Sequence, residues 1–401
     1  MKKLAVYIHI PFCVKKCAYC DFNSAAPHGS DIDDYIDALL NEIIIRSRLA
    51  SGHEVSTVFI GGGTPSYIDA SYIARILDTL RDSFEAVRPG SYNPVEVTIE
   101  CNPGTVDIGK FISYKNAGIN RVSLGLQSAD EVELKLLGRI HTYEEWLSAV
   151  NMAGKAGFIN INTDLISGIP GQTTASFMDT LNKVIHTGIP HISVYSLIVE
   201  PGTELYGLYG PGALSEDEQD IIDENDRLIY EATKKRLEIC GYKRYEISNY
   251  SKPGYECAHN IVYWRRGNYI GIGSGAASLI DNIRFANAPK LRRYISDYSE
   301  CHVRYKEQEG SVTGYISGKE KQLERLDVYG QMSEYMILGL RMAGGISVKE
   351  FAECFGRSIY DVYGDVISSW ISKGGLITEG DRIRCTEYGF NICNQIFYEF
   401  M

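Results

Sequence analysis

The sequence lacks any run of about 18 consecutive apolar residues, the length that a membrane-spanning helix requires. It also lacks an excess of positive charge, because 40 lysines and arginines are set against 51 aspartates and glutamates in 401 residues. The net charge of −11 opposes non-specific binding to phosphate backbones. Residues 1–4 lead directly into a strand-like segment instead of the apolar core of a signal peptide. We therefore expect a cytoplasmic protein that binds no nucleic acid and meets membranes only peripherally.

A second Cys-x2-Cys pair, the usual second half of a zinc ribbon, is missing as well. The chain has ten cysteines, which a reducing compartment would not join into disulfides, and Cys13, Cys17 and Cys20 fall within eight residues. A zinc site or a set of ordinary buried thiols are the weaker interpretations of this cluster. Three thiolates in one compact loop match an iron–sulfur cube in which one iron has no protein ligand. A small molecule with adjacent amino and carboxylate groups can chelate such an iron.

Apolar, β-branched segments alternate with amphipathic helical patterns over the first half of the chain. The strand-like segments cover residues 4–10, 57–60, 95–100, 121–126, 159–166 and 191–197. The helical patterns between them include residues 31–49, 71–83, 143–156 and 174–187. Such alternation builds a parallel sheet with right-handed crossovers, and six units suit a curved, incomplete barrel better than an eight-stranded one. The sequence therefore predicts an α/β fold with a partial (β/α)6 barrel.

Chemically unusual residues follow several of these strands. The cysteine loop follows the first strand and a glycine-rich strip follows the second, whereas Glu100 ends the third and Gln127 follows the fourth. In a parallel barrel these positions gather at the carboxyl face, where such folds place their sites. We therefore expect one site at this mouth of the barrel.

The second half of the chain has a different organisation. A charged helical pattern covers residues 215–240, and Gly-rich and aromatic segments follow at residues 245–280. Helices are expected at residues 326–341, 348–355 and 359–373, before a hairpin at 374–385 and a last helix. This order resembles a winged helix, although it has no basic recognition helix. We expect a barrel with a connecting helix over residues 1–240, a segment that extends the barrel over 241–320, and an α+β, winged-helix-like C-terminal domain over 321–401.

The stretch Tyr7-Ile8-His9-Ile10-Pro11-Phe12-Cys13, with Cys17 and Cys20, resembles the cluster loop of the radical S-adenosylmethionine (SAM) superfamily. Nearly the whole chain is similar to the branch that contains the HemW-type haem chaperones and the anaerobic coproporphyrinogen III dehydrogenases. The resemblance implies a partial (β/α)6 barrel in which Cys13, Cys17 and Cys20 ligate a [4Fe-4S] cluster. It also implies that the Tyr7 side chain touches SAM.

The same resemblance assigns further SAM contacts by position. They are Gly62, Gly63, Thr64, Glu100, Gln127, Arg139 and Asp164. Glycines allow close backbone approach, carboxylates suit a cationic ligand with ribose hydroxyls, and an arginine can meet a carboxylate in a fork. Each residue also has a plain alternative: a tight turn for the glycines, a strand-end cap for Glu100, and solvation for Gln127 and Arg139. Asp164 interrupts an apolar segment, where an unpaired carboxylate would cost several kcal/mol.

Two functions in this branch share the fold, so the fold does not decide between them. In the dehydrogenase the third cluster cysteine is followed by Gly and a further Cys, and an N-terminal extension completes the site. Here Cys20 is followed by Asp21 and Phe22, and six residues precede Tyr7. These departures favour the haem chaperone, with oxygen-independent coproporphyrinogen III dehydrogenase as the alternative. A radical enzyme with an unrelated substrate is a third possibility, so the sequence leaves catalysis undecided.

His259-Asn260-Ile261-Val262-Tyr263-Trp264 matches the HNxxYW pattern of HemW. The motif offers an imidazole as an axial iron ligand, with Tyr263 as a substitute, and aromatic faces that can stack on a macrocycle. Nearby basic residues could hold the haem propionates; they are Arg265, Arg266, Lys290, Arg292 and Arg293. A packed aromatic loop with a structural histidine is the alternative. The resemblance implies haem as cargo, an electron donor, and apo-haemoproteins as recipients, respiratory enzymes among them.

The segment Gly271-x-Gly273-x-Gly275 is similar to a dinucleotide-binding loop but lacks the third glycine position and a surrounding βαβ unit. We expect a close backbone approach or a tight turn there instead. The remaining cysteines have no ligand spacing.

Overall fold

The computed structural model describes residues 1–299 and 322–401. Six strands pair in chain order, all parallel, as the sequence predicted. They are β1 (Lys2–Ile10), β2 (His53–Gly62), β3 (Tyr92–Cys101), β4 (Arg121–Gln127), β5 (Asn160–Ser167) and β6 (His191–Ser196). These strands are buried on both faces, which explains their continuous apolar runs. The expected partial (β/α)6 barrel is therefore confirmed.

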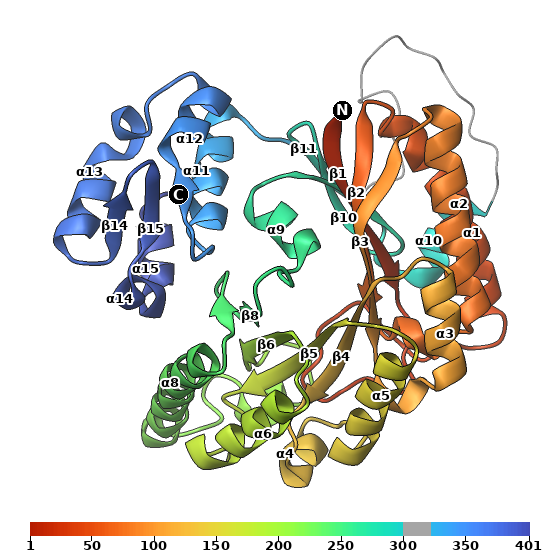
Figure 1. The fold of residues 1–401 in the computed structure, drawn as a ribbon, viewed down its shortest axis with the longest axis horizontal. Coiled ribbons are helices and arrows are strands. Elements are labelled where there is room, and N and C mark those ends of the chain that lie inside the picture. The colour runs from red at the N-terminus through yellow and green to blue at the C-terminus, as the bar shows by residue number, and fades with distance from the viewer. Residues whose placement is uncertain (300–321) are drawn as a thin grey trace.

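Helices cover the convex side of the curved sheet (Figure 1). They are α1 (Asp31–Leu49), α2 (Ala70–Val87), α3 (Ile108–Asn116), α4 (Glu131–Leu136), α5 (Tyr143–Lys155), α6 (Thr174–His186) and α8 (Glu216–Ile239), with the short η1 (Pro65–Tyr67), η2 (Pro103–Thr105) and α7 (Tyr206–Tyr209) in connections. Capping boxes begin α5 at Thr142, α6 at Thr173 and α8 at Ser215. Within the described residues, none of the helices combines the length and apolarity needed to cross a membrane.

The sheet continues beyond β1 and beyond β6. On one side lie β9 (Asn268–Ile272), β10 (Ala277–Ile280), β11 (Ile283–Ala286) and β12 (Gln322–Arg325), and on the other lie β8 (Asn249–Ser251) and β7 (Lys243–Arg244). Strand β9 is parallel to β1, and the strands beyond it are antiparallel. In the described residues this twelve-stranded sheet has β12 and β7 as its two edges, so the barrel stays open. Residues 300–320 of the segment expected to extend the barrel lie outside the described residues, as does Cys301.

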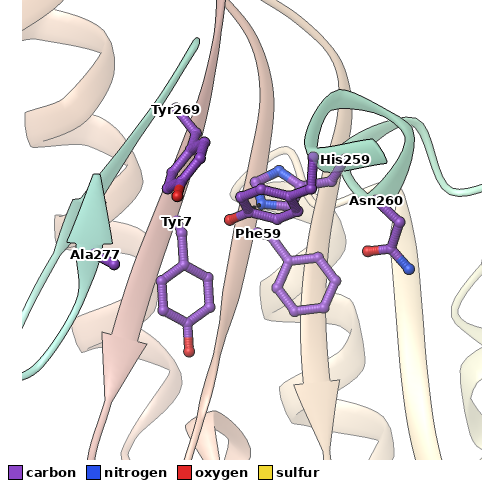
Figure 2. Close-up of a pocket in the computed structure, with 7 residues that line it drawn as sticks. Tyr7, Phe59, His259, Asn260, Tyr269 and Ala277 are labelled. Atoms are coloured by element: carbon purple, nitrogen blue, oxygen red, sulfur yellow. Dashed lines mark hydrogen bonds between the residues drawn. The ribbon is translucent and has the colours of Figure 1, made fainter. Parts of the chain in front are cut away.

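Helix α9 (Ala258–Trp264), which contains the HNxxYW motif, lies on the concave side of the sheet (Figure 1). It packs on β2, β3 and β9. Figure 2 shows its residues His259 and Asn260 facing Tyr7 and Phe59 of the sheet. The motif therefore lies inside the barrel and not on an exposed loop.

The C-terminal part has a hydrophobic core of its own around Trp370, Phe351 and Phe390. Its elements are α11 (Val328–Gly339), β13 (Ile346–Ser347), α12 (Val348–Phe355), α13 (Ile359–Ser372), β14 (Leu376–Glu379), β15 (Arg382–Cys385), α14 (Glu387–Asn391) and α15 (Cys393–Tyr398). The three strands form a small antiparallel sheet in the order β13-β15-β14. Helices followed by a hairpin give the winged-helix-like layout that the sequence predicted.

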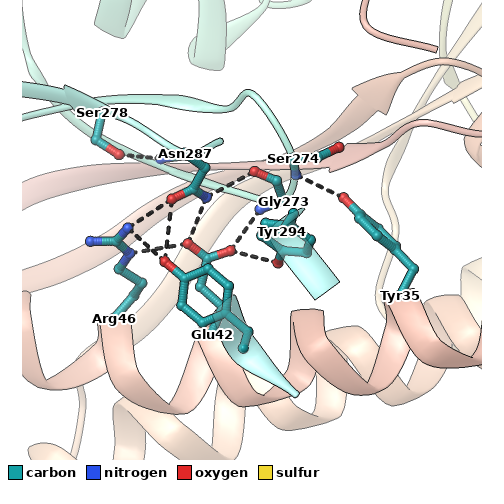
Figure 3. Close-up of polar contacts among 10 residues, drawn as sticks. Tyr35, Glu42, Arg46, Gly273, Ser274, Ser278, Asn287 and Tyr294 are labelled. Atoms are coloured by element: carbon teal, nitrogen blue, oxygen red, sulfur yellow. Dashed lines mark hydrogen bonds and ion pairs between the residues drawn. The ribbon is translucent and has the colours of Figure 1, made fainter. Parts of the chain in front are cut away.

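A buried ionic network joins α1 to the added strands (Figure 3). The Glu42 carboxylate is fully buried and accepts hydrogen bonds from Arg46 Nε (3.1 Å), Asn287 Nδ2 (2.7 Å), Gly273 N–H (2.8 Å) and the Tyr294 hydroxyl (2.7 Å). Tyr294 belongs to α10 (Leu291–Tyr298), which packs on α1. Because each carboxylate oxygen has two donors, the buried charge is compensated.

The Gly-rich segment 271–275 passes directly beside this network. A Cβ on Gly271 would lie 2.2 Å from Ala277 O, and one on Gly273 would lie 2.6 Å from His9 O. Gly273 has φ +109°, a value that side chains rarely adopt. The glycines therefore serve a close backbone approach, as expected, and not dinucleotide binding.

We predict that Glu42→Gln lowers the free energy of unfolding by about 3–5 kcal/mol, because the neutral amide loses the buried ion pair with Arg46 and turns an NH2 group toward hydrogen-bond donors. Denaturant unfolding of the apoprotein measures the effect. The control Asp78→Asn removes an exposed ion pair with Arg81 (2.7 Å) and should change the value by less than about 1 kcal/mol. Equal losses in the two variants would refute the role of the network.

Candidate functional site

The three clustered cysteines lie in the loop that follows β1, and none of them is in a disulfide. Backbone hydrogen bonds hold this loop: Cys13 N–H donates to Ala25 O (3.1 Å) and Ala18 N–H to Leu137 O (3.0 Å). Leu205 N–H donates to Ala18 O (2.9 Å), so the end of the barrel chain also contacts the loop. The cysteine loop is therefore fixed by segments that come from three separate parts of the barrel.

Two of the sulfur atoms accept hydrogen bonds. The Thr64 hydroxyl donates to Cys13 Sγ (3.4 Å), and Arg139 Nη1 donates to Cys17 Sγ (3.5 Å). Both donors lie where they could hydrogen-bond to the sulfur of a coordinated cysteine. Burial raises the pKa of the Cys20 thiol. The loop thus offers soft sulfur ligands of the kind that iron–sulfur clusters prefer.

The three thiols are not arranged around a single ion. Within residues 1–299 and 322–401, no three His, Cys, Asp or Glu side chains are close enough to hold one metal ion. A lone tetrahedral zinc needs such convergence, whereas a cube spreads its thiolates over different irons. Three thiols in one compact loop are a donor set that fits such a cluster.

The glycine strip, residues 61–65 at the end of β2, packs against the start of the cysteine loop. A Cβ on Gly63 would lie 2.9 Å from Phe12 O and 3.0 Å from Ile10 O, both backbone atoms that cannot move independently. Gly63 N–H donates to Ile10 O (2.8 Å) and Thr64 N–H to Phe12 O (2.8 Å). Residues 62–64 were expected to bring their backbone close to a ligand, but in this structure the N–H groups of Gly63 and Thr64 hold the cysteine loop.

Gly62 and Glu100 are also joined. Gly62, with φ +111°, donates its N–H to Glu100 Oε2 (3.2 Å), and its missing Cβ leaves room for the His9 ring. Burial and the nearby Asp164 charge raise the pKa of Glu100 to about 8. A cationic ligand at this position would favour the ionised carboxylate. Glu100 is therefore mostly protonated at neutral pH in this environment, and its assignment as a SAM contact stays a prediction.

Asp164 on β5 is not an unpaired carboxylate. It accepts hydrogen bonds from the Ser123 hydroxyl (2.8 Å) and from Asn162 Nδ2 (2.9 Å). These bonds offset the cost of placing a charge in an apolar strand. The remaining lone pairs of Asp164 are what a hydroxyl-bearing ligand could use.

Gln127 and Arg139 meet at the end of β4. Gln127 is mostly buried and has φ +72°, next to a register irregularity between β4 and β5. Arg139 Nη2 donates to Gly125 O (3.0 Å), while its Nη1 reaches Cys17. Gln127 is therefore buried, whereas Arg139 is half-buried. A non-glycine residue in the left-handed region is a strained conformation of the kind that clusters at functional sites.

A second part of the site is a cavity of about 290 Å³ between α9 and the sheet (Figure 2). Its lining is mostly aromatic: Tyr7, Phe59, His259, Asn260, Tyr263, Tyr269 and Ala277. The Tyr263 and Tyr269 ring centroids are 4.7 Å apart, and those of Phe59 and His259 are 5.1 Å apart. Trp264 does not line the cavity, and the Arg341 guanidinium lies 5.5 Å from its ring.

His259 is only 1% exposed, and both of its ring nitrogens have partners. Nδ1 is 3.0 Å from the Thr57 hydroxyl and Nε2 is 3.1 Å from the Tyr263 hydroxyl. Burial and the charge of Arg121 lower the pKa of His259 to about 3, so the imidazole is neutral. A metal could reach Nε2 only by replacing the Tyr263 hydroxyl.

His9, which the sequence pattern did not single out, connects the cavity to the cysteine loop. His9 Nε2 lies 2.8 Å from Asn23 O, a carbonyl that only accepts, so Nε2 carries the proton. Nδ1 must then accept from the Tyr7 hydroxyl at 3.0 Å. Tyr7 itself lines the cavity. The position of His9 in the motif was visible in the sequence, but its two hydrogen-bond partners depend on the fold.

The expected basic patch is not assembled at the cavity. Arg266 pairs with Glu334 (3.0 Å), Arg292 with Asp31 (2.5 Å) and Arg293 with Asp297 (3.1 Å). These guanidinium groups already have carboxylate partners within the chain. The structure therefore does not support their assignment to propionates.

The chain is similar to proteins of known family. The model of the radical SAM superfamily matches residues 7–184, and that of the HemN C-terminal domain matches residues 330–391. Curated proteins named heme chaperone HemW are 33% identical in Bacillus subtilis (strain 168), over 99% of both chains, and 35% identical in Escherichia coli (strain K12), over 99% of this chain and 98% of that protein.

Among solved structures, the coproporphyrinogen III oxidase HemN of Escherichia coli, described as a radical SAM enzyme, superposes with a TM-score of 0.80. The match covers 100% of this chain and 90% of that one, at 23% identity. At this identity the similarity is evidence for the fold alone.

We predict that Gly63→Ala displaces the cysteine loop, because the added Cβ meets backbone atoms of Phe12 and Ile10. The measurement is the rate at which iodoacetamide alkylates Cys13 in the apoprotein, followed by peptide mass spectrometry, and we expect it to rise several-fold. The control Gly154→Ala adds a Cβ to helix α5 with nothing within 4 Å. That variant should alkylate at the wild-type rate, and an unchanged rate in Gly63→Ala would contradict the packing argument.

Proposed function

This chain belongs to the radical SAM superfamily, in the family of the HemW heme chaperones, and from that membership we propose that it binds a [4Fe-4S] cluster, SAM and haem, and delivers haem to apo-haemoproteins. One observation carries the proposal. Tyr7 lines the aromatic cavity and also hydrogen-bonds to His9, which contacts the cysteine loop, and this supports a haem site and a cofactor site that would share one barrel mouth.

Cys13, Cys17 and Cys20 would hold the cluster. Their fit rests on three free thiols in one loop, with donors from Thr64 and Arg139 directed at two of the sulfur atoms. When bound and reduced, such a cluster would supply an electron to a SAM molecule bound beside it. An external electron donor completes this part of the proposal.

SAM would lie between the cysteine loop and the carboxylates of the mouth. Glu100 and Asp164 would offset its positive charge and accept from its amino and ribose groups, and Arg139 would meet its carboxylate. The further contacts that we propose are Tyr7, Gly62, Gly63, Thr64 and Gln127. In this chain Gly62 and Gly63 would act by keeping the strip close to the loop, since their N–H groups are already used.

Haem would enter the cavity beside α9, where Tyr263, Tyr269 and Phe59 offer faces for a flat apolar macrocycle. His259 would supply the imidazole for the iron, and its depressed pKa keeps that imidazole unprotonated at neutral pH. Trp264 belongs to the proposed haem site by its place in the HNxxYW motif, although it does not line the cavity. Haem recipients would be apo-haemoproteins, respiratory ones among them, in the cytoplasm or at its membrane surface.

Anaerobic reconstitution tests the cluster ligands. We predict that Cys17→Ala loses the iron–sulfur absorption, because two cysteines cannot replace the third ligand of the cube. Cys354→Ala, which removes an exposed thiol of α12, serves as the matched control and should keep the full absorption. A cluster that survives intact in Cys17→Ala removes the ligand assignment.

Haem titration tests the role of His259. We predict that His259→Ala weakens haem binding at least tenfold, since the iron loses its ligand. Tyr263→Phe removes only the hydroxyl that occupies Nε2, so haem should bind as tightly as to the wild type or more tightly. Weaker binding by Tyr263→Phe, together with unchanged binding by His259→Ala, would identify Tyr263 as the ligand instead.

The dehydrogenase alternative has its own assay. The reconstituted protein, with SAM and a reductant, should leave coproporphyrinogen III unchanged in an anaerobic incubation followed by porphyrin chromatography. Formation of protoporphyrinogen IX would replace the chaperone proposal by the enzymatic one.

A further inference from the structure

We propose that a chain of hydrogen bonds through the barrel interior couples the SAM site at Asp164 to helix α9, with His191 and Tyr245 as its positioning residues. The inference rests on the proposed function, because it takes Asp164 as a SAM contact and α9 as the haem-binding helix. It adds a physical connection between the two sites that neither the motifs nor the family membership supplies.

The chain begins at Asn162, two residues before Asp164 on β5. Asn162 Nδ2 donates to Asp164 Oδ1 (2.9 Å) and to the Ser123 hydroxyl (2.7 Å). A carboxylate only accepts, so the amide orientation is fixed, with Oδ1 on the opposite side. A ligand whose hydroxyls donate to the remaining lone pairs of Asp164 shares with Asn162 the carboxylate that orients the Asn162 amide. Occupancy of the SAM site therefore acts first on Asn162.

The orientation of the Asn162 amide fixes the tautomer of His191 on β6. Its Nδ1 is 2.5 Å from Asn162 Oδ1, which can only accept, so Nδ1 carries the ring proton. His191 is fully buried, and both its burial and the charge of Arg121 lower its pKa well below the ordinary value. The ring is thus neutral with a single tautomer. Nε2 is left as an acceptor, and the Tyr245 hydroxyl donates to it at 2.8 Å.

Tyr245 then connects His191 to the beginning of α9. Its oxygen accepts from Cys257 N–H (3.2 Å), and the Cys257 thiol donates to Glu96 Oε1 (3.3 Å). Glu96 on β3 also accepts the N–H groups of Ala258 (2.9 Å) and His259 (3.1 Å), the first residues of the helix. In every hydrogen bond from Asp164 to α9, the donor and the acceptor are therefore fixed.

These bonds bear directly on the haem motif. Cys257 precedes α9, and His259 is held at the other end of its side chain by Thr57 and Tyr263. A change in the position of Tyr245 would shift Cys257, the residue before the helix, and with it the His259 imidazole. The expected coupling between SAM and α9 lies in the ordinary range for linked sites, about 5–150-fold in affinity.

Amide hydrogen–deuterium exchange of cluster-loaded, haem-free protein tests the coupling without relying on haem. SAM should change the exchange rate of the peptide that covers residues 257–264 at least threefold in the wild type. Tyr245→Phe keeps the ring but removes the one oxygen that joins His191 to Cys257, so the SAM effect on this peptide should disappear. His191→Asn, which keeps a donor for Asn162 but has no acceptor in reach of Tyr245, should give the same loss if Tyr245→Phe folds poorly.

Tyr242→Phe is the matched control, because the Tyr242 hydroxyl is also buried and donates to one backbone oxygen, Ile189 O, outside the chain. It should retain the SAM effect. An equal SAM effect in Tyr245→Phe and the wild type would overturn the inference, as would no effect in a wild type that demonstrably binds SAM. Failure of the wild type to bind SAM at all would instead contradict the proposed function.

Discussion

Close backbone contact between the glycine strip and the start of the cysteine loop is the constraint on which the site depends. Gly63 lies where any Cβ would meet the backbone of Phe12 and Ile10, and the N–H groups of Gly63 and Thr64 hold these same residues. The contact places the Thr64 hydroxyl beside Cys13 and leaves space for the His9 ring over Gly62. Without it, the sulfur atoms and the carboxylates would not face one mouth.

A second constraint holds the strand that bears this loop. The carbonyl of His9 accepts from the Tyr35 hydroxyl (2.6 Å), which in turn accepts from Ser274 N–H (3.1 Å), beside the Glu42 network. The Asn23 side chain of the loop donates to Ser274 O and Pro289 O. The strands added after residue 268 therefore do more than extend the sheet. They support the cysteine loop from behind, while α9 fills the concave side in front.

The sequence predicted the fold well where the physical signal was local. Continuous apolar runs predicted the six buried strands, amphipathic patterns predicted the helices, and the spacing of Cys13, Cys17 and Cys20 predicted the loop. Contacts between distant segments could not be predicted in this way. The burial of His259 inside the barrel, the pairing of Arg266 with Glu334, and the bonds of His9 all depend on residues that only the fold brings together. The roles proposed for individual residues at the mouth therefore still rest on family membership together with this geometry.

The central claim is that three thiols hold a cube with one open iron, next to carboxylates suited to a cationic ligand. Electron paramagnetic resonance of the reconstituted, dithionite-reduced protein, recorded before and after addition of SAM, tests it most directly. The account predicts the signal of a reduced [4Fe-4S] cluster whose g-values shift when SAM binds the open iron. A reduced cluster whose spectrum stays the same at saturating SAM, or the absence of any cluster signal after reconstitution, would contradict it.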